Sequence, residues 1–193
     1  MSRPLDSTGL KRLHRSWRRR TTGRVALVLV DVQSPFNVGS ILRTAAALRV
    51  DHLWLVGDTA PPTGARTAKT ALGTERYLRW SRHDSVAEAA DAARSAGYRV
   101  VGLELAEGAT PLPELPLPDA VCLVVGHEDR GLPPAALAAC DDVAYIPQLG
   151  RVGSLNVAVA TAVALYEVRR REWAPERPGR ADPNSVGGAA PGP

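Results

Sequence analysis

The pattern of apolar and polar positions predicts an alternation of strands and helices. Short unbroken apolar runs, rich in β-branched residues, indicate strands that are buried on both faces and are therefore parallel. Ala-rich or amphipathic stretches between them, bounded by Gly, Pro or Asn, indicate helices. Strands are expected at residues 25–30, 53–56, 77–80, 99–105, 120–125 and 143–146, and helices at residues 38–48, 66–72, 84–96, 133–139 and 155–168.

This alternation predicts an α/β fold, with an open, mostly parallel sheet and helices on both faces. Sheets of this kind bind ligands beyond the carboxyl ends of their strands. Three loops of unusual composition each follow a predicted strand: residues 31–37, 126–131 and 147–154. We therefore expect these three loops to converge on one site, with Asn37 capping the helix that follows the first of them.

The last predicted helix follows a loop with two glycines. Pro147 ends the preceding strand, Gly150 and Gly153 allow backbone to approach a ligand closely, and Ser154 is expected to cap the helix. From residue 155 to 168 nearly every side chain is apolar or small, in all directions around the helix axis. Such a helix has to be covered on all sides, by the rest of the fold or by another subunit.

The net charge of +4 is unevenly distributed along the chain, because residues 1–24 contain eight Lys or Arg and Asp6 as their one acidic residue. Leu10, Leu13 and Trp17 fall on one stripe of a predicted helix in this segment. A basic segment favours a polyanionic partner, so we interpret it as a helix that docks by its apolar stripe and offers cations to RNA phosphates. A merely solvated charged arm is the alternative. The cations concerned are Lys11, Arg12, Arg15, Arg18 and Arg19.

Composition predicts the domain organisation, and the absence of several motifs argues against other classes of protein. We expect a basic RNA-binding segment at residues 1–23, one domain at residues 24–172, and a disordered Pro/Gly-rich tail at residues 173–193. With no membrane-length apolar run and no secretory leader, a cytoplasmic protein is expected. The two cysteines and four histidines are too scattered to predict a metal site. The Gly-rich dinucleotide, P-loop and hydrolase nucleophile motifs are absent, which argues against a Rossmann-like oxidoreductase.

Three motifs lie at the predicted strand ends: Asn37-x5-Arg43-Thr-Ala, Gly126-x-Glu128-x-x-Gly131 and Ile146-Pro-x-x-Gly150-x3-Ser154-Leu155-Asn156-Val157. Each has an ordinary explanation by itself, as a helix start or a strand-to-helix turn. Together and in this order they resemble the three motifs of the SpoU/TrmH branch of the SPOUT superfamily, over about residues 24–172. Members of this branch are S-adenosylmethionine-dependent RNA ribose 2′-O-methyltransferases.

The resemblance implies a C-terminal trefoil knot that binds S-adenosylmethionine, and a homodimer with the active site at its interface. It also implies roles for individual residues. The residues implied to hold the cofactor are Leu103, Glu104, Gly126, Gly131, Ile146, Gln148, Gly150, Ser154 and Leu155. The residues implied to shape the catalytic site or to meet the RNA are Asn37, Arg43, Glu128, Ser154 and Asn156.

The sequence departs from the family pattern at three positions near the third motif. Gln148 stands where many relatives carry Met, and Gly153 and Ala158 replace commoner Glu or Ala and Ser. Because a guanidinium is hard to deprotonate, we expect Arg43 to bind a phosphate and stabilise the attacking oxygen, and its role as a base stays open. A short N-terminal segment favours tRNA over rRNA as the substrate. An rRNA methyltransferase and a catalytically silent RNA-binding dimer of the same fold are the alternatives.

Overall fold

Residues 3–173 are described by a computed structural model, and they contain a seven-stranded sheet in which each strand pairs in parallel with its neighbours. The strand order is β3-β2-β1-β6-β4-β7-β5. The strands are β1 (Arg24–Val30), β2 (Leu53–Val56), β3 (Trp80–His83), β4 (Arg99–Leu103), β5 (Thr110–Pro111), β6 (Ala120–Val125) and β7 (Asp142–Tyr145). Because the strands are parallel, the loops that leave their carboxyl ends lie at one edge of the sheet.

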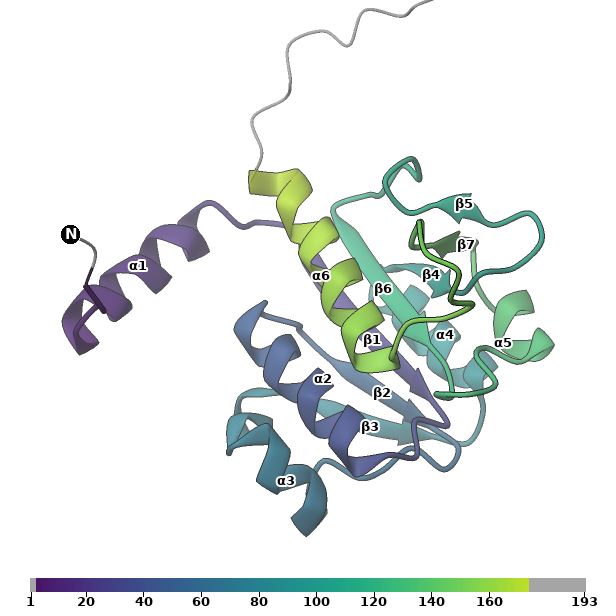
Figure 1. Ribbon diagram of the computed structural model, residues 1–193, viewed down its shortest axis with the longest axis horizontal. Coiled ribbons are helices and arrows are strands. Elements are labelled where there is room, and N and C mark those ends of the chain that lie inside the picture. Colours follow the sequence, from purple (N-terminus) through teal and green to yellow (C-terminus); the bar gives the residue numbers. More distant parts are fainter. Residues whose placement is uncertain (1–2, 174–193) are drawn as a thin grey trace, which may run out of the picture.

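Helices cover both faces of this sheet, as the sequence predicts (Figure 1). Helices α2, α3 and α6 lie on one face, and α4 and α5 lie on the other. The helical segments are α1 (Ser7–Arg19), α2 (Pro35–Ala47), α3 (Ala65–Ala71), the 3-10 turn η1 (Thr74–Tyr77), α4 (Val86–Ser95), α5 (Pro134–Ala138) and α6 (Val157–Trp173).

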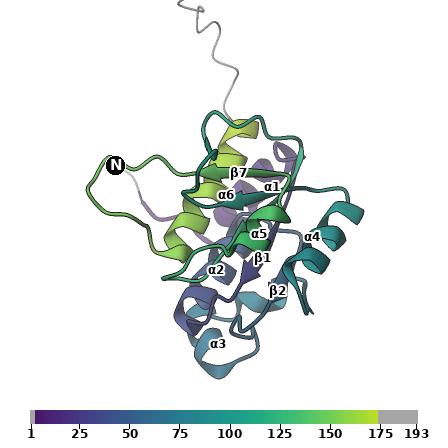
Figure 2. The ribbon, with the colours of Figure 1, turned by 90° about the vertical axis from the view of Figure 1, so that its right-hand side faces the viewer.

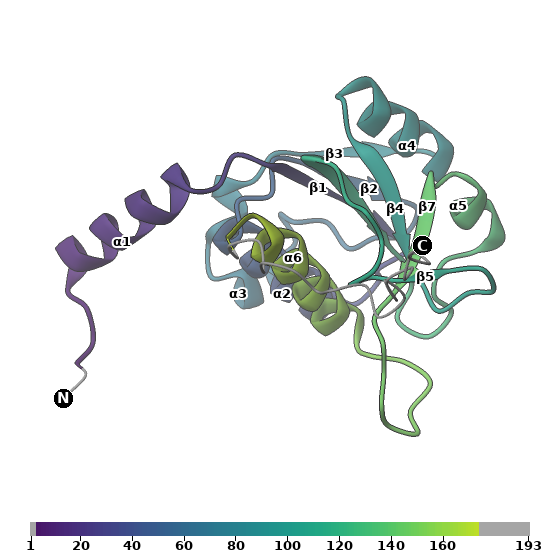
Figure 3. The same cartoon turned by 90° about the horizontal axis from the view of Figure 1, so that it is seen from above.

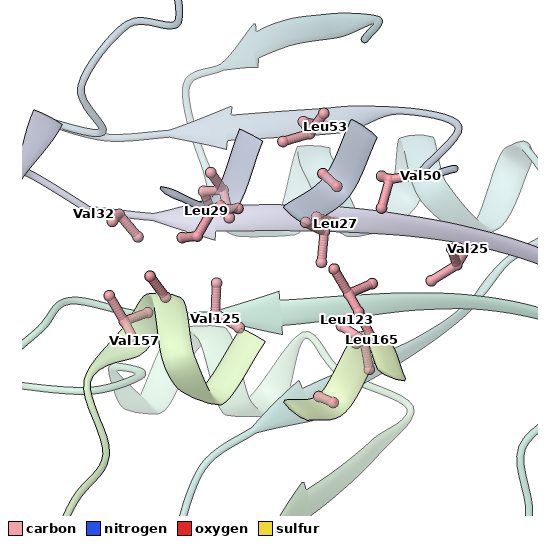
Figure 4. Close-up of a cluster of buried hydrophobic side chains, with 14 of the residues drawn as sticks. Val25, Leu27, Leu29, Val32, Val50, Leu53, Leu123, Val125, Val157 and Leu165 are labelled. Atoms are coloured by element: carbon pink, nitrogen blue, oxygen red, sulfur yellow. The ribbon is translucent and has the colours of Figure 1, made fainter. Parts of the chain in front are cut away.

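Strand β1 shows why the apolar runs do not alternate with polar residues. Leu27 and Leu29 pack in the cluster beneath α2 and α6, together with Leu123 of β6 and Leu165 of α6 (Figure 4). The intervening Val28 belongs to the cluster on the opposite face, beneath α4. A central parallel strand is buried on both faces, so every position along it has to be apolar.

Several predicted boundaries are wrong by a few residues. The third strand runs from Trp80 to His83, and the residues before it form η1. The two-residue strand β5 has no apolar run to reveal it, because one of its residues is Pro111. Helix α2 begins earlier than predicted, with Ser34 as its N-cap and Pro35 in its first turn, so Asn37 lies inside the helix. Pro is preorganised for a first helical position, which makes Ser-Pro a strong start signal.

Helix α6 is covered on one side only. Ala164, Leu165 and Val168 are buried in the core cluster, whereas Val159, Val163 and Tyr166 are 51%, 43% and 55% exposed. The prediction that the rest of the fold or another subunit covers the helix on all sides is therefore not met by this chain alone.

The basic N-terminal helix is present as α1, and it extends away from the sheet (Figure 1). The apolar stripe of α1 remains largely exposed, since Leu10, Leu13 and Trp17 are 45%, 42% and 38% exposed. Of these three side chains, Trp17 makes the predicted contact with the rest of the fold. The Trp17 ring lies 5.1 Å from that of Trp173, centroid to centroid. The predicted tail lies outside the described residues apart from Trp173, which ends α6.

Between residues 3 and 173, no helix combines the length and the apolar character needed to span a membrane. Within the same range, no group of three or more His, Cys, Asp and Glu side chains is placed to hold a metal ion.

Candidate functional site

The loops that follow β4, β6 and β7 surround a cavity of about 270 Å³. The last of these loops, between β7 and α6, projects from the body of the molecule (Figure 2 and Figure 3). Eight of the nine residues predicted to bind a cofactor line the cavity: Leu103, Glu104, Gly126, Gly131, Ile146, Gln148, Ser154 and Leu155. Gly150 is exposed and does not line it.

The loop from Gly126 to Gly131 folds back on itself. The backbone N–H of His127 donates to the Gly131 carbonyl at 3.1 Å, and the Gly131 N–H donates to the His127 carbonyl at 3.0 Å. A Cβ at Gly126 would lie 2.3 Å from the Gly131 carbonyl oxygen, and Gly131 itself has φ +65. Only glycine fits both positions, which accounts for the spacing of the second motif.

Glu104 holds this loop against the end of β4. Its Oε2 accepts a hydrogen bond from the Leu132 N–H at 2.8 Å, and its Oε1 accepts one from the Leu105 N–H at 3.0 Å. A Cβ at Gly131 would lie 2.1 Å from Glu104 Oε2. The Glu104 side chain therefore shapes the cavity wall through backbone contacts.

Asn37, Glu128 and Asn156 come from three distant segments and are connected by hydrogen bonds. Asn37 Nδ2 donates to Glu128 Oε1 at 2.9 Å, and Asn156 Nδ2 donates to Asn37 Oδ1 at 3.1 Å. The backbone N–H of Ser34 also donates to Glu128 Oε1, at 3.0 Å. The predicted convergence of the three loops is thus found, and it is made by side chains of the three motifs.

The environment of Glu128 favours its ionised form. Burial by itself raises the pKa of this carboxyl, but the hydrogen bonds from the Asn37 side chain and from nearby backbone N–H groups, that of Ser34 among them, outweigh burial. The net effect holds the pKa of Glu128 below its ordinary value. The site therefore presents a carboxylate, which accepts hydrogen bonds and donates none.

Asn156, rather than Ser154, caps α6. Its Oδ1 accepts hydrogen bonds from the N–H groups of Ala158 and Val159, at 3.0 and 3.2 Å. The first N–H groups of a helix have no partner within the helix, so this cap fixes where α6 begins. Because the same side chain donates to Asn37, the start of α6 is tied to the start of α2.

Two predicted catalytic residues lie outside this network. Arg43 is exposed on α2, and within residues 3–173 its side chain makes no hydrogen bond or ion pair. Ser154 lines the cavity and is exposed, with no side-chain hydrogen bond to another described residue. In a single chain, Arg43 is therefore not brought to the cavity.

The sequence reasoning missed two contributors to the site. Ser34 caps α2 and supplies a backbone donor to Glu128, and its Ser-Pro pair is a signal that could have identified it. His127 lines the cavity and accepts a hydrogen bond from the Asp129 N–H at 3.0 Å through Nδ1. No spacing rule singles out this histidine, because its position depends on how the loop closes.

Gln148 lines the cavity and carries an amide oxygen that is unpaired within residues 3–173. Its Oε1 is buried and has no hydrogen-bond partner in the described chain. Buried amide oxygens are nearly always paired, and an unpaired one is costly. Gln148 lines the cavity together with the apolar Ile146 and Leu155, so this unpaired amide oxygen lies within the cavity wall.

Comparisons with known proteins agree with these features. The family model described as the SpoU rRNA Methylase family matches residues 24–166. The chain is 34% identical over 148 residues to the 23S rRNA (guanosine(2553)-2′-O)-methyltransferase RlmP of Bacillus subtilis. The matched region covers 77% of this chain and 59% of that protein. An AdoMet-bound rRNA methyltransferase from Sinorhizobium meliloti is similar in structure, with a TM-score of 0.72 and 31% identity over 78% of this chain and 58% of that one.

A second similar structure concerns the 2-OH methylation of C/U34 on tRNA. It has a TM-score of 0.69 and 34% identity, and the match covers 77% of this chain and 96% of that chain. By contrast, the chain spans about three fifths of the length of the curated relatives it matches. The family match covers most of the chain and includes all three motifs. The chain therefore belongs to the SpoU rRNA methylase family.

Proposed function

We propose that this protein methylates a ribose 2′-hydroxyl of RNA, with S-adenosylmethionine as the methyl donor. The observation that carries this proposal is the network of Asn37, Glu128 and Asn156, which lies next to a cavity built from backbone-rich loops. A hydroxyl that attacks a methyl group needs positioning and a polar surrounding more than it needs covalent chemistry from the protein.

The cavity can take part of the cofactor, and its lining combines polar and apolar groups. Its volume of about 270 Å³ suits part of a nucleoside, and Gly126 and Gly131 let backbone approach it without side chains in between. The Gln148 Oε1 is unpaired and shielded in the described chain, and it is proposed to turn toward the cavity and accept a hydrogen bond from the 6-amino group of adenine. When bound, S-adenosylmethionine supplies the electrophilic methyl group.

Asn37 and Asn156 are proposed to orient the RNA. Asn37 Nδ2 uses one N–H for Glu128, and Asn156 Nδ2 uses one for Asn37, so each amide keeps one N–H for a substrate oxygen. Glu128 holds the Asn37 amide in place and would add negative charge to the cavity that holds the positively charged cofactor. These three residues thereby fix the direction from which a ribose hydroxyl approaches.

Arg43 is proposed to act on the RNA from the exposed surface of α2. Its guanidinium is well suited to bind a phosphate beside the target and to stabilise the oxygen as its proton leaves. Because it is exposed and has no partner within residues 3–173, it is free to meet RNA or another subunit.

A homodimer and a trefoil knot are part of the same proposal. The uncovered face of α6, with Val159, Val163 and Tyr166, supports a second copy of the chain as its cover. Likeness to SpoU and TrmH structures supports the fold, and within it we place the knot in the C-terminal third of the chain. A cytoplasmic location follows from an RNA substrate.

We infer that tRNA is a better substrate than rRNA. The support is the structure concerned with tRNA methylation, to which the chain is 34% identical over a match that covers 96% of that structure. The experiment is transfer of labelled methyl from S-adenosylmethionine to total tRNA and to total rRNA by the purified protein. We expect label in tRNA. Label in rRNA alone would overturn the choice of tRNA, and no label in either RNA would contradict the enzymatic function.

A further inference from the structure

Positive charge outside α1 is concentrated in one short stretch of the chain. Residues 65–82, which span α3, η1 and most of β3, contain five Lys or Arg and one Glu. The rest of the chain after residue 24 contains eleven Lys or Arg against eighteen Asp or Glu. An otherwise acidic body thus carries a local cationic region, which attracts polyanions.

Most of these cations are free to bind a partner. Arg66, Lys69, Arg76 and Arg79 are exposed, and none forms an ion pair within residues 3–173. By contrast, Arg94 near the end of α4 is paired with Asp141, and Arg99 at the start of β4 is paired with Asp142. Unpaired cations give up fewer protein contacts when they bind phosphates.

Exposed aromatic rings lie among these cations. Tyr77 is 69% exposed, and the Arg76 guanidinium lies over its ring at 4.9 Å from the centroid. Trp80 is 37% exposed and begins β3, which is one of the two edge strands of the sheet. Alternating cations and exposed rings suit single-stranded RNA, whose phosphates need charge and whose bases stack on flat surfaces.

This region is continuous with the surface around Arg43. Helix α3 packs tightly on α2 at Gly39, where a Cβ would lie 2.6 Å from Thr70 Cβ. Arg43 is one turn further along α2 and so emerges on the side that faces α3. RNA bound at Arg43 can therefore continue over α3, which lies beside α2 in Figure 1, and over η1, which also contacts α2.

We propose that Arg66, Lys69, Arg76, Tyr77 and Arg79 form an RNA-binding surface, here named the α3–β3 surface, that is separate from the basic helix α1. Its cations contact phosphates next to the target nucleotide, and Tyr77 stacks on an unpaired base. The inference rests on RNA as the substrate of the proposed function, but it concerns binding and not methyl transfer.

The test is the affinity of the full-length protein for a tRNA transcript at several salt concentrations. The variant carries Arg66→Gln, Lys69→Gln, Arg76→Gln and Arg79→Gln. We expect binding about tenfold weaker or more at ~0.1 M salt, and a salt dependence whose slope falls by roughly one unit for each phosphate that the variant no longer binds. Tyr77→Leu is expected to weaken binding to a single-stranded RNA by about tenfold with little change in slope.

A matched pair of variants separates local contacts from overall charge. Arg66→Gln with Lys69→Gln and Arg94→Gln with Arg99→Gln each remove two positive charges. We expect the first pair to weaken binding and the second to leave it within about twofold, since surface charges away from the RNA act only through a screened field. Thermal unfolding and S-adenosylmethionine titration check that each variant is folded.

Equal loss of affinity in both pairs, or wild-type affinity in the fourfold variant, would overturn the α3–β3 surface. The proposed function fails by a different result, namely wild-type protein that transfers no methyl group to any RNA. If the wild-type protein transfers no methyl group and the fourfold variant still binds RNA more weakly, the α3–β3 surface is supported and the enzymatic function is refuted.

Discussion

At the scale of single residues, the direction of each hydrogen bond in the site is fixed from both ends. Ionised Glu128 can only accept, so Asn37 has to present Nδ2 to it and Oδ1 to Asn156. The free N–H groups at the start of α6 can only donate, so Asn156 has to present Oδ1 to them and Nδ2 to Asn37. Both amides are thereby held in one orientation before any substrate binds, which favours catalysis.

The pKa of Glu128 leads to a prediction about stability and pH. Because its pKa in the folded protein is held below the ordinary value of 4.5, ionised Glu128 stabilises the fold above that value, and the contribution is lost as pH falls through the lowered pKa. In Glu128→Gln this contribution is absent. The difference in free energy of unfolding between wild type and variant, measured by urea unfolding, should be constant near neutral pH and shrink below 4.5. A difference that does not change with pH would contradict this environment for Glu128.

Gln148 allows a direct test of how the cofactor is bound. Gln148→Met keeps the length of the side chain and removes the acceptor, so we expect S-adenosylmethionine to bind about tenfold more weakly in an isothermal titration. The inosyl analogue has a base that lacks the 6-amino group. The wild-type protein should bind this analogue more weakly than S-adenosylmethionine, whereas the variant should bind the two compounds with equal affinity. Equal discrimination by both proteins would show that Gln148 does not contact the base. If S-adenosylmethionine does not bind the wild-type protein, its assignment as the cofactor is wrong.

At the scale of secondary-structure elements, α6 is held at both ends by polar contacts. Asn156 fixes its start, and near its end the buried Arg169 donates to the carbonyls of Leu48, Gly23 and Arg49 at 2.9, 2.7 and 2.9 Å. These carbonyls belong to the end of α2 and the start of β1. Arg169 thus joins the last helix to the first α/β unit of the sheet.

Replacing Arg169 should therefore destabilise the protein far more than replacing its neighbour. Arg169→Met leaves three carbonyls and Glu172 Oε1 without the Arg169 donor, and we expect a loss of roughly 3–5 kcal/mol in the free energy of unfolding. Arg170, which is paired with Glu167 on the surface, is the control. Arg170→Met should cost at most about 1 kcal/mol. Denaturant unfolding measures both, and similar losses would contradict the structural role of Arg169.

Elements that are governed by local chemistry can be predicted from the sequence. The strands at residues 53–56 and 120–125 are found with the predicted bounds, because their apolar runs end sharply. The predicted position of the third strand is wrong because Tyr77 and Leu78 have the composition of a strand, but Tyr77 belongs to η1 and Leu78 is the extended residue that ends it. The predicted caps of α2 and α6 are also wrong, because several candidate capping side chains lie near each start and tertiary contacts choose among them.

At the scale of the whole molecule, the parallel sheet brings together residues that are far apart in the chain. The order β1-β6-β4-β7 places the loops of the second and third motifs around one cavity, and the first motif joins them at the start of α2. This convergence is predictable, since it follows from parallel topology alone. Two other features cannot be predicted from the sequence, namely the isolated position of α1 and the position of Arg43 away from the cavity. Both depend on packing between elements or between subunits.

The uncovered face of α6 leads to a prediction about assembly. If a second chain covers it, the wild-type protein should sediment at about twice its chain mass of 20.5 kDa at micromolar concentration. Val163→Asp places a charge in the centre of that face and should give monomers, because burial of an unpaired carboxylate is costly. Leu72→Asp, at a 64% exposed position on the far side of α2, is the control and should leave the mass unchanged. Monomeric wild type would contradict the homodimer.

The identity of the methylated atom can be measured by mass spectrometry of nucleosides from RNA treated with S-adenosylmethionine and the protein. We expect a 2′-O-methyl nucleoside from wild type. We expect at least about a hundredfold less product from Asn37→Ala, which loses both hydrogen bonds of the network, at nearly unchanged cofactor affinity. A methyl group on a base, or full activity in Asn37→Ala, would refute ribose methylation directed by the Asn37, Glu128 and Asn156 network.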